Sequence, residues 1–283
     1  MLEIRDFLLH LRLNYNFFIL SAPFFLGALY VPEIIDVKLF IFLFILLYVF
    51  LFGGANAYNS YFDKDEGPIG GLEHPPKMKR WMYYLSIILQ LIGLLLSLIV
   101  KPVFGFLFLI SIILFWLYSS PVFRFKGKAL LSFLVIGIGT AFNTTLMGYV
   151  SAGGSTFDFS LILGALGVTF IILSMYPFSQ VYQIDEDTKR GDVTFAVKYG
   201  VRGIKINYAI FFFLGVVLLV YSLRFNILFT ITFLLVGILA YVLIWQIIKT
   251  ISGKREEYRK VMRTKYLGGL CFTITMLIFL IIF

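Results

Sequence analysis

The feature that most constrains this chain is a series of nine long stretches that contain no Lys, Arg, Asp or Glu. They cover residues 13–32, 39–62, 81–100, 102–123, 129–157, 159–184, 206–223, 225–248 and 266–283. Each is long enough, or nearly so, for a helix to cross a hydrocarbon core, which takes about 20 residues. Backbone groups must pair internally in lipid, and the stretches lack a two-residue alternation, so we expect helices rather than strands.

Composition supports lipid as the solvent of this chain. Of its residues, 60% are hydrophobic and 14% are charged, whereas soluble domains carry about 25% charged residues. We therefore predict an all-α integral membrane protein, in which nine transmembrane helices surround a central cavity and residues 1–283 form a single domain. Residues 2–12 mix apolar and charged side chains, which predicts a short interfacial helix rather than a cleaved signal. The single Cys271 excludes an intramolecular disulfide.

The basic residues predict the orientation of the helices. When the N-terminus is placed in the cytoplasm, all 24 Lys and Arg fall in cytoplasmic segments except Lys38, Lys101 and Arg224. This asymmetry follows the positive-inside rule. It explains the net charge of +9 without a nucleic-acid partner. It also predicts that the long polar loops 63–80, 185–205 and 249–265 are cytoplasmic, and that Phe283 lies outside.

Two of these loops follow helix ends that share one spacing: an amide, an Asp four residues later, and a Gly four residues after that. The residues are Asn59, Asp63 and Gly67 at the second helix, and Gln183, Asp187 and Gly191 at the sixth. The spacing places the amide and the Asp on one helix face, and the Gly suits a helix C-terminus. The two ends suggest an internal pseudo-repeat, with two units four helices apart whose polar ends face each other.

Carboxylate and amide oxygens are the ligands that Mg²⁺ prefers, often together with phosphate oxygens of a substrate. Candidate metal ligands are Asn59, Asp63, Asp65, Glu66, Gln183, Asp185 and Asp187. Candidate residues for binding a diphosphate are Lys64, Lys77, Arg124, Lys126, Lys189 and Arg190. A single acidic loop beside a membrane is usually a solvated surface, but two loops with one spacing on one side favour a shared site. The basic run 249–265 is more typical of contact with anionic lipid, and Arg124 and Lys126 fit either role.

At these residues the chain resembles the UbiA-type intramembrane prenyltransferase superfamily. That family has nine transmembrane helices, with an Asn-x-x-x-Asp-x-x-x-Asp motif after helix 2 and an Asp-x-x-x-Asp motif after helix 6. The resemblance runs from about residue 5 to 270 and includes 59–76, 118–127 and 182–200. Two positions depart from the family pattern: Gly67 replaces the second Asp of the first motif, and Gln183 replaces the first Asp of the second.

The resemblance implies transfer of a prenyl group from an isoprenyl diphosphate to a lipophilic acceptor, with Mg²⁺ as cofactor. Asp63 and Asp187 would be the catalytic carboxylates. Metal and basic residues would stabilise the departing diphosphate, and nearby aromatic rings the allylic cation. Those rings are Tyr58, Tyr61, Tyr176 and Tyr182. The acceptor stays open among aromatic acids, quinone precursors, polyprenyl glyceryl phosphates, tetrapyrroles and carotenoids, and nothing indicates an obligate protein partner.

A second hypothesis is a secondary transporter of a small anionic or lipophilic solute, because transporters also use pseudo-repeats and paired polar sites. Transporters usually keep such residues near the bilayer midplane, whereas these carboxylates lie at the cytoplasmic edge. A third candidate, a CDP-alcohol phosphotransferase, is disfavoured because its Asp-Gly-x-x-Ala-Arg element is absent.

Overall fold

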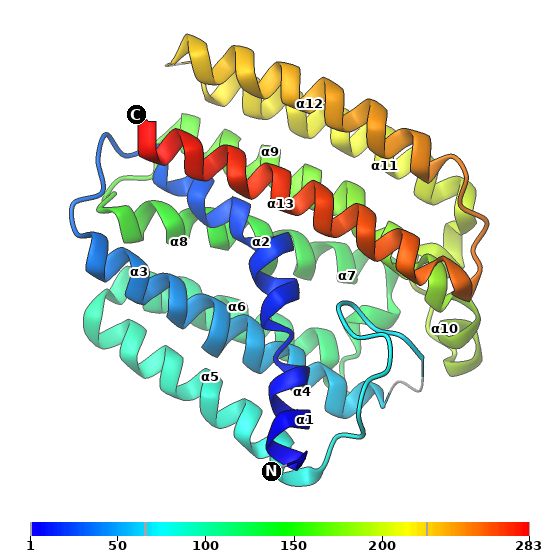
Figure 1. The fold of residues 1–283 in the computed structure, drawn as a ribbon. Coiled ribbons are helices and arrows are strands. Elements are labelled where there is room, and N and C mark those ends of the chain that lie inside the picture. The colour runs from blue at the N-terminus through cyan, green and yellow to red at the C-terminus, as the bar shows by residue number, and fades with distance from the viewer. Residues whose placement is uncertain (1, 65–66, 225, 283) are drawn as a thin grey trace.

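The computed structural model describes residues 2–64, 67–224 and 226–282, and within these ranges the chain folds into a bundle of helices (Figure 1). A short helix, α1 (Leu2–His10), precedes nine helical passages. In chain order these are α2 (Leu13–Ala28); α3 (Val37–Ile45) continued by η1 (Leu46–Gly53) and α4 (Gly54–Asp63); α5 (Arg80–Val100); α6 (Pro102–Ser119); α7 (Ala129–Ile136) continued by η3 (Gly137–Phe142) and α8 (Asn143–Ala152); α9 (Phe159–Met175) continued by η4 (Pro177–Gln183) and α10 (Ile184–Arg190); α11 (Phe195–Ser222); α12 (Ile227–Ile248); and α13 (Tyr258–Ile282).

The all-helical prediction is confirmed in the part of the chain that the structure describes. Eight of the passages are long and apolar enough to cross a membrane, and the ninth, α2, is shorter, with 16 residues. The tight hairpin expected at Lys101-Pro102 is present, because α5 ends at Val100 and α6 begins at Pro102.

Several helices extend beyond the uncharged stretches that predicted them. The seventh and ninth passages begin at Phe195 and Tyr258, rather than at residues 206 and 266. Helices can carry charged residues where they emerge from the membrane, so the absence of charge marks the lipid-embedded part of a helix and not its ends. Segments 185–205 and 249–265 are therefore partly helical and not simply loops.

The outer helices present apolar side chains away from the bundle. On α12, Leu235, Leu239 and Leu243 follow one another at four-residue spacing and are each more than half exposed. Such a stripe is unfavourable in water but favourable against acyl chains. The outer surface of the bundle is thus the surface of an integral membrane protein.

Glycines allow two of the central helices to cross in close contact. A Cβ on Gly148 of α8 would lie 1.9 Å from the carbonyl oxygen of Phe24 on α2, and one on Gly27 would lie 1.9 Å from the carbonyl oxygen of Thr145. Without a strong hydrophobic drive between helices in lipid, such backbone contact is a main source of helix association. This crossing fixes α2 inside the bundle, beside the ends of the motif helices.

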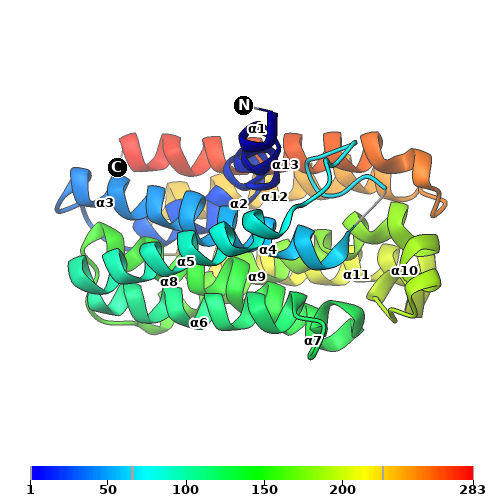
Figure 2. The same ribbon diagram turned by 90° about the horizontal axis from the view of Figure 1, so that it is seen from below.

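Both acidic motifs lie at the same end of the bundle. Figures 1 and 2 show α10, the end of α4 and the segment leading to α5 gathered there, while the C-terminal end of α13 lies at the opposite end. Helix α1 is tied to the segment before α5 by an ion pair between Glu3 and Lys79 and by His10 Nε2, 2.8 Å from the carbonyl oxygen of Pro76. Burial lowers the pKa of His10, so near pH 7 the neutral imidazole donates this hydrogen bond.

The orientation of the bundle in the membrane stays a prediction from its basic residues. We expect His74, which is exposed beside the first motif, to lie in the cytoplasm, and the exposed Ser155 to lie outside. In a background with Cys271→Ser, a membrane-impermeant maleimide added to intact cells should label Ser155→Cys, and should label His74→Cys only after permeabilisation. Labelling of both positions in intact cells would contradict this orientation.

Candidate active site

A polar cavity of about 240 Å³ lies between the two motif ends. On the second passage, Ala55, Asn56, Asn59 and Asp63 line it. Asn56, Asn59 and Asp63 follow one another at spacings of three and four residues, which place them on one helix face. The cavity-facing side chains of α4 are therefore positioned by a regular helix that continues to Asp63 itself.

The opposite wall comes from the sixth passage, where Tyr176, Ser179, Gln183 and Asp187 face the cavity. Here the helix tightens into the 3₁₀ segment η4 and then resumes as α10 at Ile184. The amide and the Asp of the second motif thus lie on either side of a change in helix type. The two motifs share a spacing in sequence but differ in local geometry.

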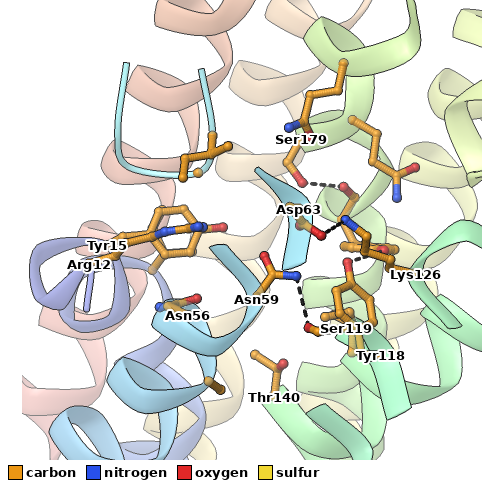
Figure 3. A pocket seen from close by; sticks show the side chains of 18 of the residues that line it. Arg12, Tyr15, Asn56, Asn59, Asp63, Tyr118, Ser119, Lys126, Thr140 and Ser179 are labelled. Atoms are coloured by element: carbon orange, nitrogen blue, oxygen red, sulfur yellow. Dashed lines mark hydrogen bonds and ion pairs between the residues drawn. The ribbon is translucent and has the colours of Figure 1, made fainter. Parts of the chain in front are cut away.

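The ion pair between Asp63 and Lys126 lies on the cavity wall and is nearly buried, with 6% and 12% of the two side chains exposed. The ammonium of Lys126 also acts electrostatically on Asp187. The one ammonium of Lys126 therefore interacts electrostatically with carboxylates from both motifs. Figure 3 shows Lys126 reaching across to Asp63 from the segment before α7.

The two motif amides are oriented by their own hydrogen bonds. Asn59 Nδ2 donates to Ser119 Oγ at 3.0 Å (Figure 3), and Gln183 Nε2 donates to the carbonyl oxygen of Pro68 at 3.5 Å. Each bond occupies an amide nitrogen and leaves the amide oxygen as the atom that can bind a ligand. Both motifs therefore offer oxygen donors to the cavity.

The loop that contains Arg124 and the loop that contains Asp192 are far apart in the sequence and are joined by hydrogen bonds. Arg124 donates to Asp192 through Nε and a terminal nitrogen, each at 2.7 Å, and backbone hydrogen bonds link Val193 to Gly127 and Ala129. The hydrogen bonds to Asp192 raise the pKa of the Arg124 guanidinium, so it stays charged. Asp187 in turn accepts a hydrogen bond from the Thr194 hydroxyl at 3.1 Å.

The glycines that follow the two motifs differ in role. Gly191 has φ of 78° and ends α10 in the left-handed conformation, as expected for a helix C-terminus. The first motif does not end this way, because Lys64, with φ of 50°, is the left-handed residue after α4. Gly67 lies instead against another side chain: a Cβ there would be 2.9 Å from Glu186 Oε2.

In the described part of the chain, no group of three or more His, Cys, Asp or Glu side chains is close enough to hold a metal ion unaided. The cavity offers carboxylates from the two motifs separately.

Comparison with known proteins identifies the family. A model of the UbiA prenyltransferase family matches residues 18–268. The chain belongs to this family. No curated protein sequence matches it.

Solved structures of UbiA proteins share the fold at low sequence identity. A UbiA homologue from Archaeoglobus fulgidus bound to DMAPP and Mg²⁺ has a TM-score of 0.76 and 14% identity, covering 98% of this chain and 100% of the other. A UbiA homologue from Archaeoglobus fulgidus bound to GPP and Mg²⁺ has a TM-score of 0.75 and 17% identity, covering 98% of this chain and 100% of the other. A digeranylgeranylglyceryl phosphate synthase gives 0.62 and 20%, covering 98% and 99%.

Some residues proposed from the UbiA resemblance lie away from the cavity. Tyr61 stacks on Tyr83 of α5, and the ring of Tyr58 packs against the same residue at a tilt. Both lie on other faces of α4, because they are one residue before and two residues after Asn59. Neither ring lines the polar cavity, and their placement in a substrate pocket stays a prediction. Exposed side chains outside the cavity wall are Lys64, Lys77, Asp185 and Lys189. Asp65 and Glu66 lie outside the described residues.

Other proposed residues do line the cavity of this UbiA protein. These are Asn59, Asp63, Lys126, Tyr176, Tyr182, Gln183, Asp187 and Arg190. Arg190 is also paired with Glu186. Arg124 supports the wall through Asp192, as described above.

Several cavity residues were not among the site candidates. They include Arg12, Tyr15, Asn16, Asn56, Tyr118, Ser119, Asp192, Thr194 and Lys265. Polar side chains inside predicted spans, such as Asn16 and Asn56, carried a usable signal because they are costly in lipid. Lys265 did not, because it ends a basic run that is also typical of lipid contact.

The Arg124–Asp192 pair should hold the two loops together cooperatively. We expect Arg124→Ala and Asp192→Ala each to lower the free energy of unfolding. The double variant should lose less of it than the sum of the two single losses. The coupling free energy should be about 1–3 kcal/mol, as for contacting charged residues. Unfolding by SDS titration measures it.

The exposed pair of Arg259 and Glu73 is the matched control for this cycle. Its coupling should fall below about 1 kcal/mol, because solvent screens surface ion pairs. Equal coupling at the two pairs would contradict a special role for Arg124 and Asp192.

Proposed function

We propose that this chain transfers a prenyl group from an isoprenyl diphosphate to a lipophilic acceptor in a reaction that depends on Mg²⁺. The observation that carries the proposal is the shared cavity, into which Asp63 and Asp187 project from two separate motifs. The UbiA homologue of the same fold that binds DMAPP or GPP with Mg²⁺ supports it. The active site opens to the cytoplasm in this proposal.

The donor set fits Mg²⁺. Asp63 and Asp187 supply carboxylates, and Asn59 and Gln183 supply amide oxygens, which are the hard ligands that this ion takes. Mg²⁺ usually keeps several positions for water or substrate phosphate, so two separate carboxylates suffice. When bound with substrate, the ion stabilises negative charge on the departing diphosphate.

The basic residues of the cavity bind the diphosphate directly. Lys126 exchanges its contact with Asp63 for a phosphate oxygen, which leaves the carboxylate free to bind metal. Arg190, on the same side of the cavity as Asp187, adds a second cation with several donors suited to phosphate. These residues stabilise the negative charge that develops on the diphosphate when the C–O bond breaks and the diphosphate leaves with the bonding electrons.

Aromatic residues stabilise the allylic cation that remains. Tyr118 and Tyr176 face the cavity and are held together by a 3.0 Å contact between their hydroxyls. Tyr182 lies nearby, packed edge-on against Tyr258. The faces of such rings attract a cation. The acceptor nucleophile then bonds to the cationic carbon and releases a proton.

An apolar chamber of about 460 Å³ adjoins the polar cavity and shares Ile19, Ile172, Met175 and Lys265 with it. Its walls come mainly from α9, α11, α12 and α13. Hydrocarbon parts of the substrates fit there. Such walls also keep water from the cation, which would otherwise be quenched to an alcohol.

Loss of either motif carboxylate should stop the reaction. We expect Asp63→Ala and Asp187→Ala each to lower Mg²⁺-dependent prenyl transfer at least about a hundredfold, or on the order of 3 kcal/mol in the barrier. The assay incubates purified protein with a series of isoprenyl diphosphates and acceptors and identifies products by mass.

Glu73→Gln is the control, because it removes an exposed carboxylate of the same segment outside the cavity wall. It should keep near-normal turnover. Near-normal turnover of folded Asp63→Ala and Asp187→Ala would overturn the proposed site.

Binding of Mg²⁺ and diphosphate should be mutually dependent. We expect a non-reactive isoprenyl thiodiphosphate to raise the melting temperature clearly with Mg²⁺ and little with EDTA, since a ligand at 100 times its Kd adds about 2.7 kcal/mol. The stabilisation should disappear in Asp63→Ala. Equal stabilisation with EDTA would contradict the metal requirement.

A further inference from the structure

Lys265 of α13 is a charged side chain in an unusual position. It is 8% exposed and lies two turns into α13, directly before the uncharged stretch 266–283. Its ammonium donates to the Tyr15 hydroxyl at 2.9 Å and lies 5.2 Å from the centre of the same ring. In the described part of the chain it pairs with no carboxylate.

Three other cations at or near the cavity are paired with carboxylates. Lys126 pairs with Asp63, Arg124 with Asp192 and Arg190 with Glu186. A buried ammonium costs several kcal/mol unless an opposite charge compensates it. A phenol satisfies one of its three N–H donors and supplies no full negative charge. Lys265 is thus a buried cation whose counter-charge the described chain does not supply.

Tyr15, the hydrogen-bond partner of Lys265, lies across the cavity from the proposed diphosphate site. Figure 3 shows Tyr15, together with Arg12, across the cavity from Asp63 and Lys126, with Asn59 between them. Arg12 is held there by a 2.6 Å hydrogen bond to Ser60 Oγ. The cavity therefore has two basic sides, and the motif carboxylates lie at one of them.

Lys265 also lies where the polar cavity meets the apolar chamber, since it lines both. A molecule bound there can place an anionic group on the ammonium and its hydrocarbon against the chamber walls. The cavity in between then leads toward the reacting carbon of the isoprenyl diphosphate.

We propose that Lys265, positioned by Tyr15, binds the anionic group of the acceptor, so that the acceptor is a lipophilic molecule carrying a carboxylate or a phosphate. This inference rests on the proposed prenyl transfer. It selects, among lipophilic acceptors, those with an acidic group over neutral ones. Lys265 is a specificity-determining residue for the acceptor rather than part of the diphosphate site.

Direct binding tests the proposal apart from turnover. The probes are a hydroxyaryl carboxylate and its neutral amide, and a prenyl glyceryl phosphate and its neutral glycerol ether. Affinities are measured on the full chain in detergent with Mg²⁺ and the isoprenyl thiodiphosphate present. The wild type should bind at least one anionic probe about tenfold or more tightly than its neutral partner, the range expected for one charge-assisted contact.

Lys265→Met should abolish that preference, whereas Lys265→Arg should keep most of it. Binding of the neutral probes and of the thiodiphosphate should be unchanged in both variants. The control Arg263→Met removes a cation from the exposed side of the same helix and should keep the preference. The anionic probe that shows the effect distinguishes a carboxylate acceptor from a phosphate acceptor.

Three results would overturn the inference. In the first, the wild type binds neither anionic probe more tightly than its neutral partner. In the second, Lys265→Met weakens binding of the anionic and the neutral probes equally. In the third, Lys265→Met weakens binding of the thiodiphosphate instead, which assigns Lys265 to the donor site. Failure of prenyl transfer with an intact, Lys265-dependent anion preference would count against the proposed function alone.

Discussion

The ion pair between Asp63 and Lys126 joins the second helical passage to the segment before the fifth, at a depth where few side-chain atoms reach solvent. Breaking a nearly buried pair of this kind leaves an uncompensated charge and costs several kcal/mol. The pair therefore holds the end of α4 against the loop that contains Lys126. That loop is itself attached to the segment after α10 through Arg124 and Asp192. Two ion pairs on one loop therefore connect the two motifs.

The same arrangement suits a site that binds a highly charged substrate. Under the proposed function, Lys126 would release Asp63 to a metal ion and take a phosphate oxygen instead. The empty and occupied states then both keep their charges paired. Helices α4 and α10 carry the two motif carboxylates, and side chains on regular helices stay in place better than side chains on loops.

Much of the site was predictable from helix periodicity and much was not. Asn59 and Asp63 share a face at four-residue spacing, and both line the cavity. The same periodicity places Tyr58 and Tyr61 on other faces of α4, where their rings pack against Tyr83, although both are close to Asn59 in the sequence. Exposed Lys64, Lys77 and Lys189 were indistinguishable in sequence from Lys126, because their difference depends on where each loop folds back.

The sequence by itself determined the membrane environment, the number of passages and the end of the bundle that carries the acidic motifs, because these follow from the hydration cost of charge along the chain. Only the tertiary structure decided which basic residues face the cavity. Lys265 and Tyr15 are 250 positions apart, and they meet because α13 packs on α2 where Gly269 lets the backbones approach, since a Cβ there would lie 2.3 Å from the carbonyl oxygen of Phe18. The order of charges in the sequence does not predict such a contact, because it depends on the close packing of two helices that are distant in the chain.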